Sequence, residues 1–382
     1  MSAPTFVTAE SVTEGHPDKV CDQVSDAILD ELLRQDPLSR VAVETLATAG
    51  VVVVAGEVTT KGFVDVQKVV RGVLRDIGYT DARYGADSED VGVLVSLHQQ
   101  SPDISRGVGR GKNLGAGDQG LMFGYACRET PEFMPLPITL AHRLAQGLAR
   151  ARKSRRLPYL RPDGKTQVVL EYKDGVPVGL AHVVVAAQHD EHVSMLRLRT
   201  EVLAQVIKPI VGKLWNSRTK VSINATGRFV SGGPEADTGL TGRKLMVDTY
   251  GGYAHHGGGC FSGKDPSKVD RSGAYAARYI AKNLVAAGLA DRCEVSLGYV
   301  IGQADPISLG VETFGTSTLS EDKLLDIVRK HFPLRPGQII AQLKLQRPIY
   351  RATAAYGHFG RSGPGFTWER LDKVRLLKRY AL

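Results

Sequence analysis

Residues 17–77 read PDKVCDQVSDAILDELLRQDPLSRVAVETLATAGVVVVAGEVTTKGFVDVQKVVRGVLRDI, and the elements that this stretch predicts decide the fold. Apolar residues spaced three and four apart predict a helix over 17–33 and a second helix over 64–77. Between them, β-branched runs that flank a glycine predict a strand pair across 41–60. A helix, a strand pair and a further helix therefore form one unit.

The same order of elements recurs twice further along the chain. The second unit has a helix over 138–153, strands across 167–188 with a turn at Lys173-Asp174-Gly175, and a helix near 191–207. The third has a helix over 272–287, strands across 293–313 and a helix over 321–332. The period is too long for a solenoid. We therefore expect an α+β fold of three structurally similar α/β-sandwich domains in a pseudo-threefold arrangement.

We place the N-terminal domain at 1–102, the central domain at 121–234 and the C-terminal domain at 235–382. The connecting segment, 103–120, lies within SPDISRGVGRGKNLGAGDQG at 101–120, which is rich in glycine and poor in apolar residues. It is either an interdomain linker or a mobile lid, and its basic residues favour a lid over an anionic ligand. Because helices cover one face of each predicted sheet, the other face is expected to pack against another domain or another subunit.

Size and composition indicate a soluble globular protein with more than one core. The chain has 382 residues, which is long for a single hydrophobic core. Its longest apolar run, at 51–55, is far shorter than the roughly 18 residues of a membrane span. The N-terminus has no apolar signal region, and the four cysteines are scattered without a CxxC motif. We therefore expect a cytoplasmic protein with no membrane partner.

The formal net charge of +9 allows either nucleic-acid binding or the capture of a small anion. The best nucleic-acid candidate is RARKSRR at 150–156. This run lies at the end of a predicted helix, where cations favour the helix dipole, and it has no interleaved aromatic residues. A basic nucleic-acid-binding scaffold without catalysis is thus the alternative, and we expect no nucleic-acid partner.

The stretch DTYGGYAHHGGGCFSGKDPSKVDR at 248–271 predicts chemistry instead of packing, because it contains few large apolar residues. Its glycines would let backbone N–H groups approach a bulky anion. Lys264 and Lys268 would supply countercharge, and Asp265 and Asp270 are candidate ligands of a divalent metal. The stretch is typical of a polyphosphate site with Mg²⁺, and the alternative is a flexible surface loop.

Five blocks together resemble one family. They are EGHPDK at 14–19, GDQGLMFGY at 117–125, GLTGRK at 239–244, GGGCFSGKD at 257–265 and AYGHFG at 355–360. With them the chain resembles the methionine adenosyltransferase, or S-adenosylmethionine synthetase, family from about residue 6 to the C-terminal helix. The threefold repeat is also what that family's fold implies.

The resemblance implies that ATP, L-methionine and water yield S-adenosylmethionine, phosphate and diphosphate. The methionine sulfur attacks C5′ of the ribose in an SN2 step and expels the triphosphate, which is then hydrolysed. A thioether is already a neutral nucleophile, so this step needs no general base. Charge builds on the triphosphate, and fixed cations with metal ions stabilise it. This requirement suits a site that is rich in lysine, arginine and aspartate.

The resemblance also assigns residues to the phosphates and metals. His16, just before the helix that starts at Pro17, resembles the histidine beside the leaving oxygen. It implies two Mg²⁺ ions per site with Asp18 and Asp270 as ligands, and K⁺ at Glu44. With His16, the residues that it implies for catalysis are Lys165, Arg243 and Lys264.

The remaining assignments concern the two substrates. The implied methionine contacts are Glu57, Gln100, Asp237 and Lys268. The implied ATP contacts are His16, Asp163, Lys165, Arg228, Phe229, Asp237, Arg243, Lys244, Cys260 and Lys264. Cys260 stands where many members of the family have a small apolar residue, which raises the possibility of oxidation near the ligand. Asp118 lies in a family motif, but its direct role stays open.

The resemblance further implies a homodimer with shared active sites, and a homotetramer in solution. The rival enzyme class is another ATP-dependent enzyme, such as a kinase. Against a kinase, the sequence has no Gly-x-x-x-x-Gly-Lys-Ser/Thr loop and no His-Arg-Asp triplet. A kinase would also release ADP, whereas adenosyl transfer releases phosphate and diphosphate.

Overall fold

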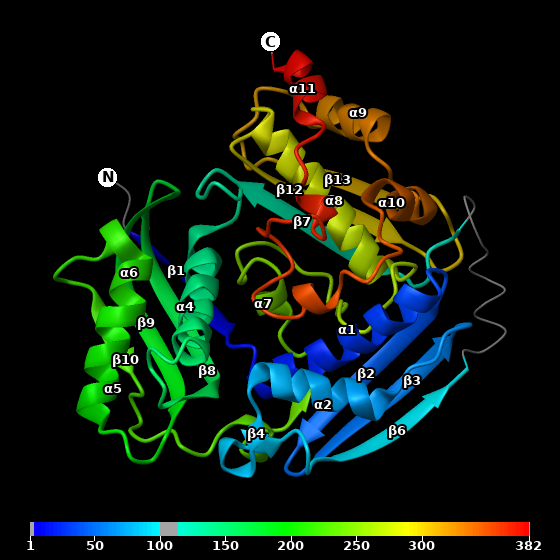
Figure 1. Cartoon of the computed structure of the whole chain (residues 1–382). Coiled ribbons are helices and arrows are strands. Elements are labelled where there is room, and N and C mark those ends of the chain that lie inside the picture. Colours follow the sequence, from blue (N-terminus) through cyan, green and yellow to red (C-terminus); the bar gives the residue numbers. More distant parts are fainter. Residues whose placement is uncertain (1–3, 100–113, 382) are drawn as a thin grey trace.

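The structure is a computed structural model that describes residues 4–99 and 114–381. Three sheets, each with helices against one face, surround a central region that contains the short helix α7 (Leu245–Asp248) (Figure 1). The α+β class with three similar units, predicted from the repeat, is confirmed. The predicted lid lies largely outside the described residues, and the domain limits stay predictions.

The first sheet has the strand order β11-β2-β3-β6, and helices α1 and α2 cover one of its faces (Figure 1). β2 pairs antiparallel with β3 and β11, whereas β6 runs parallel to β3. A two-stranded hairpin of β4 and β5 follows α2. The bounds are α1 Pro17–Gln35, β2 Arg40–Thr48, β3 Val51–Thr59, α2 Val66–Ile77, β4 Thr80–Asp81, β5 Ala86–Asp87, β6 Gly92–His98 and β11 Gly239–Leu240.

The second sheet has the order β1-β8-β9-β10, with α4, α5 and α6 beside it. Asp174 and Gly175 both have positive φ (51° and 77°), as a tight hairpin turn requires, and this confirms the predicted turn between β8 and β9. The helix predicted near 191–207 is α5 followed by a π-helical turn at Leu203–Ile207. The bounds are β1 Thr5–Val12, α4 Leu136–Lys153, β8 Leu160–Lys173, β9 Val176–His189, α5 Met195–Val202, α6 Lys208–Val211 and β10 Lys220–Ile223.

The third sheet has the order β13-β12-β7, and α8 packs across it. Helix α8 is buried along almost its whole length, including Arg271 and Arg278, because α10, α11 and the C-terminal loops cover its other side. The bounds are β7 Gly120–Cys127, α8 Val269–Ala286, β12 Arg292–Tyr299, β13 Ser308–Glu312, α9 Glu321–His331, α10 Pro336–Leu343 and α11 Val374–Leu377.

Each sheet takes one strand from a distant part of the chain. β1 pairs with β8, β7 pairs with β12, and β11 pairs with β2. The repeat did not predict these three strands, because their partners lie more than a hundred residues away. These exchanges tie the three units together, and the first and third share one continuous core.

The face of the first sheet opposite α1 carries a row of apolar side chains. The register places Leu240 beside Leu46, Leu46 beside Val53, and Val53 beside Leu94. Leu94 at the end of this row is 60% exposed. A row of this kind, without a covering helix, matches the expectation that the open sheet faces need cover.

Within the described ranges no helix combines the length and the apolar character needed to cross a membrane.

Candidate active site

The start of α1 presents a neutral histidine. His16 is the N-cap of the helix, and its Nδ1 accepts the backbone N–H of Asp18 at 3.2 Å. Burial and, next, the Lys244 ammonium lower the pKa of His16 to about 3. Because Nδ1 acts as the acceptor, the proton of the neutral ring lies on Nε2. His16 can therefore donate one hydrogen bond without carrying charge.

Asp18 holds a lysine and a loop beside this histidine. Its Oδ2 lies 2.5 Å from Nζ of Lys244, and its Oδ1 accepts the backbone N–H of Leu240 at 3.0 Å. Burial opposes ionisation, but these two hydrogen bonds outweigh it and lower the pKa of Asp18. Arg243 reaches toward the same carboxylate at 3.9 Å and is half-exposed. The loop 239–244 thus brings two cations to the N-terminus of α1.

Asp163 and Lys165 on β8 face the same region. Oδ2 of Asp163 accepts the N–H of Gly233 at 2.9 Å, whereas its Oδ1 is buried and has no hydrogen-bond partner among the described residues. Burial raises the pKa of Asp163 to about 6. Lys165 is exposed, and its charge contributes to the lowered pKa of His16, so the two side chains are neighbours. A buried acceptor without a partner is suited to a ligand hydroxyl or amino group.

A histidine that the sequence did not single out holds Phe229. Nε2 of His189 accepts the N–H of Phe229 at 3.0 Å, and the N–H of His189 donates to the Phe229 carbonyl at 2.9 Å. The adjacent Arg228 is exposed, as is Asp237. No sequence signal marked His189, because a histidine at the end of a strand has no distinctive spacing.

A second group of residues lies around Lys264. Its Nζ is 2.6 Å from Oδ2 of Asp270 in the first turn of α8. Burial raises the pKa of Asp270, and the charge of Asp118 adds to this, which places Asp118 beside the pair. Burial also raises the pKa of the Cys260 thiol. The second group therefore contains a lysine and two carboxylates, next to a protonated thiol.

Within one chain, the described residues of the two groups are not joined by a polar contact. In the described ranges, no hydrogen bond or ion pair joins His16, Asp18, Asp163 or Lys244 to Lys264 or Asp270. The groups approach only through packing, because a Cβ on Gly242 would lie 2.5 Å from Cβ of Cys260. A single chain thus presents two separate sets of cations and carboxylates.

The chain matches three family models in sequence order. The models for the N-terminal, central and C-terminal domains of S-adenosylmethionine synthetase match residues 4–102, 113–229 and 231–370. The chain belongs to the S-adenosylmethionine synthetase family. It is also 59% identical, over 97% of its length and 98% of the relative, to a protein of Pseudothermotoga lettingae named S-adenosylmethionine synthase. Membership in this synthetase family confirms the resemblance found in the sequence and excludes the kinase and nucleic-acid scaffold alternatives.

Three other predicted residues of the synthetase are placed differently. Nζ of Lys268 donates to the Val41 carbonyl and contacts Asp265, so it is engaged inside the protein. Glu44 and Glu57 lie on the helix-free face of the first sheet, and Glu57 contacts His98 at 3.2 Å. Gln100 lies outside the described residues. Hydrogen bonds and ion pairs among the described residues join Lys268, Glu44 and Glu57 to neither group, although the charge of Glu44 helps to raise the pKa of Cys260.

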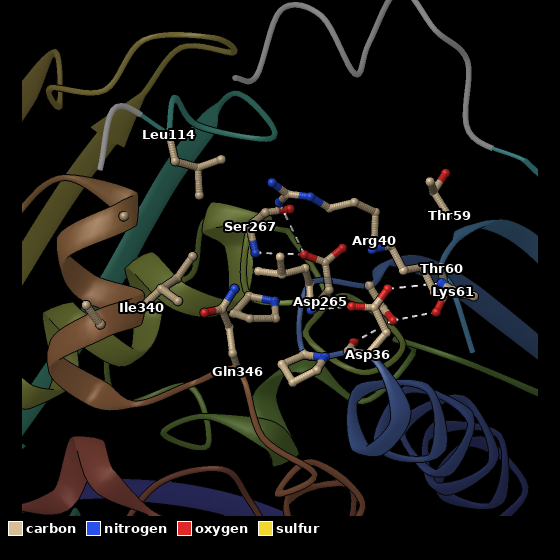
Figure 2. Close-up of a pocket in the computed structure, with 16 residues that line it drawn as sticks. Asp36, Arg40, Thr59, Thr60, Lys61, Leu114, Asp265, Ser267, Ile340 and Gln346 are labelled. Atoms are coloured by element: carbon tan, nitrogen blue, oxygen red, sulfur yellow. Dashed lines mark hydrogen bonds and ion pairs between the residues drawn. The ribbon is translucent and has the colours of Figure 1, made fainter. Parts of the chain in front are cut away.

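Asp265 is structural, contrary to our first interpretation of the glycine-rich stretch. Its carboxylate accepts the N–H groups of Val41 and Ser267 and also binds Lys268. Figure 2 shows it beside a cavity of about 600 Å³ that Arg40, Lys61 and Ile340 also line. Apart from Asp265, none of the described residues that were predicted for substrate or metal lines this cavity.

The described residues hold no cluster of three or more His, Cys, Asp or Glu side chains that could bind a metal. Mg²⁺ at phosphate sites keeps several waters and takes one or two carboxylates, with phosphate oxygens as further ligands. Asp18 and Asp270 each offer one carboxylate beside a lysine. The donor set therefore fits Mg²⁺ held together with a polyphosphate and does not fit an all-protein metal cage.

Proposed function

We propose that this chain is a methionine adenosyltransferase that converts ATP, L-methionine and water into S-adenosylmethionine, phosphate and diphosphate. The observation that carries the proposal is the doubled pairing of carboxylate and lysine, Asp18 with Lys244 and Asp270 with Lys264. Each pair joins a proposed metal ligand to a proposed phosphate ligand. Two such pairs match the demands of a triphosphate leaving group.

The residues around His16 would act on the reacting end of the triphosphate. The neutral Nε2–H of His16 would donate to the oxygen that leaves C5′, where negative charge appears as the bond breaks. Lys165, Arg243 and Lys244 would hold the phosphates next to it. Asp163, through its buried Oδ1, and Phe229 would orient the nucleoside. The same cations would then retain the triphosphate for hydrolysis.

Metal ions complete this site in our proposal. Two Mg²⁺ ions, one held by Asp18 and one by Asp270, would neutralise phosphate oxygens, and K⁺ would bind near Glu44. The lysines are the key protein element, because each ammonium could donate to a phosphate oxygen while its carboxylate binds the metal ion. Lys244 and Lys264 are thus placed to bind phosphate next to a metal ion.

We further propose that two chains build each site together. The first group would come from one chain and the second group from its partner, which brings Lys264 and Asp270 to the phosphates held by Lys244. The apolar row from Leu240 to Leu94 supports a contact between sheet faces. We expect an obligate homodimer, paired into a homotetramer in the cytoplasm, with a dimer contact larger than about 2,000 Å².

Product analysis tests the reaction directly. The purified chain with ATP, MgCl₂ and L-methionine should form S-adenosylmethionine, phosphate and diphosphate in equal amounts. Omitting methionine should abolish adenosyl transfer, and omitting K⁺ should slow it. Formation of ADP, or ATP turnover that does not depend on methionine, would contradict the proposal.

A further inference from the structure

Four aspartates on α1 lie one turn apart on the same side of the helix; the last, Asp30, accepts the backbone N–H groups of Tyr350 and Arg351, and the first three face the loops of the proposed site. Asp18, Asp22 and Asp26 are spaced four residues apart, so their side chains stack along the helix axis. All three are buried. Only Asp18 has a place in the proposed reaction, and the other two need a separate explanation.

Each of the three carboxylates accepts a backbone N–H from a loop. Oδ1 of Asp18 accepts from Leu240 at 3.0 Å, and Oδ1 of Asp22 accepts from Gly242 at 2.9 Å. Oδ1 of Asp26 accepts from Gly263, also at 2.9 Å. The residues that follow the two glycines are Arg243 and Lys264. The helix therefore holds the backbone immediately before a proposed phosphate ligand in two different loops.

A buried cation balances each of the two additional carboxylates. Nζ of Lys19 lies 2.8 Å from Oδ2 of Asp22, and the Arg271 guanidinium binds both oxygens of Asp26 at 2.8 and 2.7 Å. Arg271 also donates to the Lys264 carbonyl at 3.0 Å. The peptide group before Gly263 is thus held by Asp26, and the peptide group after Lys264 is held by the ion-pair partner of Asp26.

The backbone at both anchoring points requires glycine. Gly242 and Gly263 have φ values of 80° and 81°, which other residues rarely adopt. A Cβ on Gly263 would lie 1.9 Å from the Val43 carbonyl oxygen. Neither loop can relax around a side chain here, so the register between each loop and α1 is fixed.

Hydroxyl groups add further contacts between α1 and the loop 239–244. Ser25, on α1 between Asp22 and Asp26, is 2.9 Å from Oγ1 of Thr241. Thr241 in turn accepts the backbone N–H of Thr45 at 3.0 Å. The loop 239–244 is therefore attached at three consecutive residues, Leu240, Thr241 and Gly242. This density of contacts just before Arg243 and Lys244 is more than helix packing alone requires.

We infer that Asp22 and Asp26 are positioning residues, which set the places of Arg243 with Lys244 and of Lys264 for phosphate binding. The inference rests on the proposed function and adds residues that touch neither substrate nor metal. In a dimer with shared sites, the two loops would serve different sites. Helix α1 of one chain would then position Arg243 and Lys244 in one site and Lys264 in the other.

A matched pair of variants tests the role of Asp22. Both variants keep Lys19, whose ammonium stays paired with the buried Asp248 at 2.5 Å, and one carries Asp22→Asn where the other carries Asp22→Leu. Asparagine keeps an oxygen for the Gly242 N–H, whereas leucine has similar bulk and no acceptor. Per folded molecule, we expect kcat/KM for ATP to be about tenfold lower with leucine, as the loss of one hydrogen bond implies. The KM for methionine should be equal in the two variants. The corresponding variants are Asp26→Asn and Asp26→Leu, both in an Arg271→Met background. The leucine variant should again have the lower kcat/KM for ATP.

Equal kcat/KM for ATP in the leucine and asparagine variants, with only the melting temperature changed, would overturn the positioning role. If the leucine variants do not fold, Thr241→Val tests the same loop, with Ser39→Ala, in the turn between α1 and β2, as the control. Thr241→Val should lower kcat/KM for ATP and Ser39→Ala should not, and equal values would again overturn the inference. A wild-type chain that makes no S-adenosylmethionine would refute the proposed function instead. Calorimetric binding of magnesium tripolyphosphate to the same variants would then decide the positioning role.

Discussion

Nζ of Lys264 lies 2.6 Å from Oδ2 of Asp270, so a proposed phosphate ligand and a proposed metal ligand neutralise each other. Lys244 and Asp18 repeat this relationship at 2.5 Å. Binding of a magnesium polyphosphate would give each lysine a phosphate and each carboxylate a metal ion. The net charge of the site would then change little, although new ion pairs would form.

We predict that Asp18→Asn or Asp270→Asn lowers turnover by at least about 100-fold and raises the Mg²⁺ concentration needed for half-maximal rate. The amide is a poorer metal ligand and leaves its lysine unpaired. Steady-state rates over a Mg²⁺ titration measure this effect. Asp305→Asn, at an exposed pair with Arg335, is the control. Near-normal rates at limiting Mg²⁺ in either variant would exclude that residue as a metal ligand.

The two lysines of the glycine-rich stretch should behave differently when they are removed. Lys268→Met leaves the buried Asp265 carboxylate with only the more distant Arg40, 3.7 Å away, and should cost up to about 3 kcal/mol of folding free energy. Lys264→Met should lower turnover strongly, with a smaller loss of stability, because its partner Asp270 lies at the site. Denaturant unfolding and kinetics of both variants measure the contrast. Unchanged stability together with a raised KM for methionine in Lys268→Met would support the methionine contact that the family resemblance implies.

His16→Asn separates the two half-reactions. Asparagine is a good N-cap, so α1 should keep its start. The variant loses the Nε2–H donor, which is needed only while the C5′–O bond breaks. We therefore expect adenosyl transfer to fall by about 100-fold and hydrolysis of added tripolyphosphate to fall much less. Equal losses in the two assays would show that His16 merely supports the helix or positions phosphates.

The sequence predicted the parts of the site that depend on local pattern. The helix that begins at Pro17 was predicted correctly, because capping and spacing determine it, whereas the phosphate site in the lysine- and glycine-rich stretch stays a prediction. The roles of Asp22 and Asp26 could not be predicted, since charged residues at helical spacing usually mark a solvated face. Their partners Gly242 and Gly263 lie more than 200 residues away. The strand exchanges were missed for the same reason, because pairing between distant strands depends on the tertiary fold.

Asp163 gives a pH dependence that can be checked without activity. Burial raises its pKa to about 6 in the folded protein, compared with about 3.9 in an unfolded chain. Between these values the folded state binds more protons, so the free energy of unfolding decreases as pH rises from about 4 to 6, by up to about 3 kcal/mol. Asp163→Asn keeps an acceptor for the Gly233 N–H and should remove this decrease. Unfolding curves at pH 4, 5, 6 and 7 measure the difference, and parallel pH profiles of variant and wild type would contradict the assignment.

The shared site predicts complementation between inactive chains. Asp18→Asn damages only the first group of a chain, and Asp270→Asn damages only the second. In a mixed dimer, the intact first group of the Asp270→Asn chain and the intact second group of the Asp18→Asn chain together form one undamaged site. The other site contains both damaged groups. Equal amounts refolded together should give mixed dimers in half of the population, and therefore about a quarter of the wild-type activity. Each variant refolded alone should stay inactive, and a mixture of two Asp18→Asn preparations is the matched control. Mixed dimers verified by differently sized tags, without recovered activity, would refute the shared site, as would a fully active monomer in light scattering.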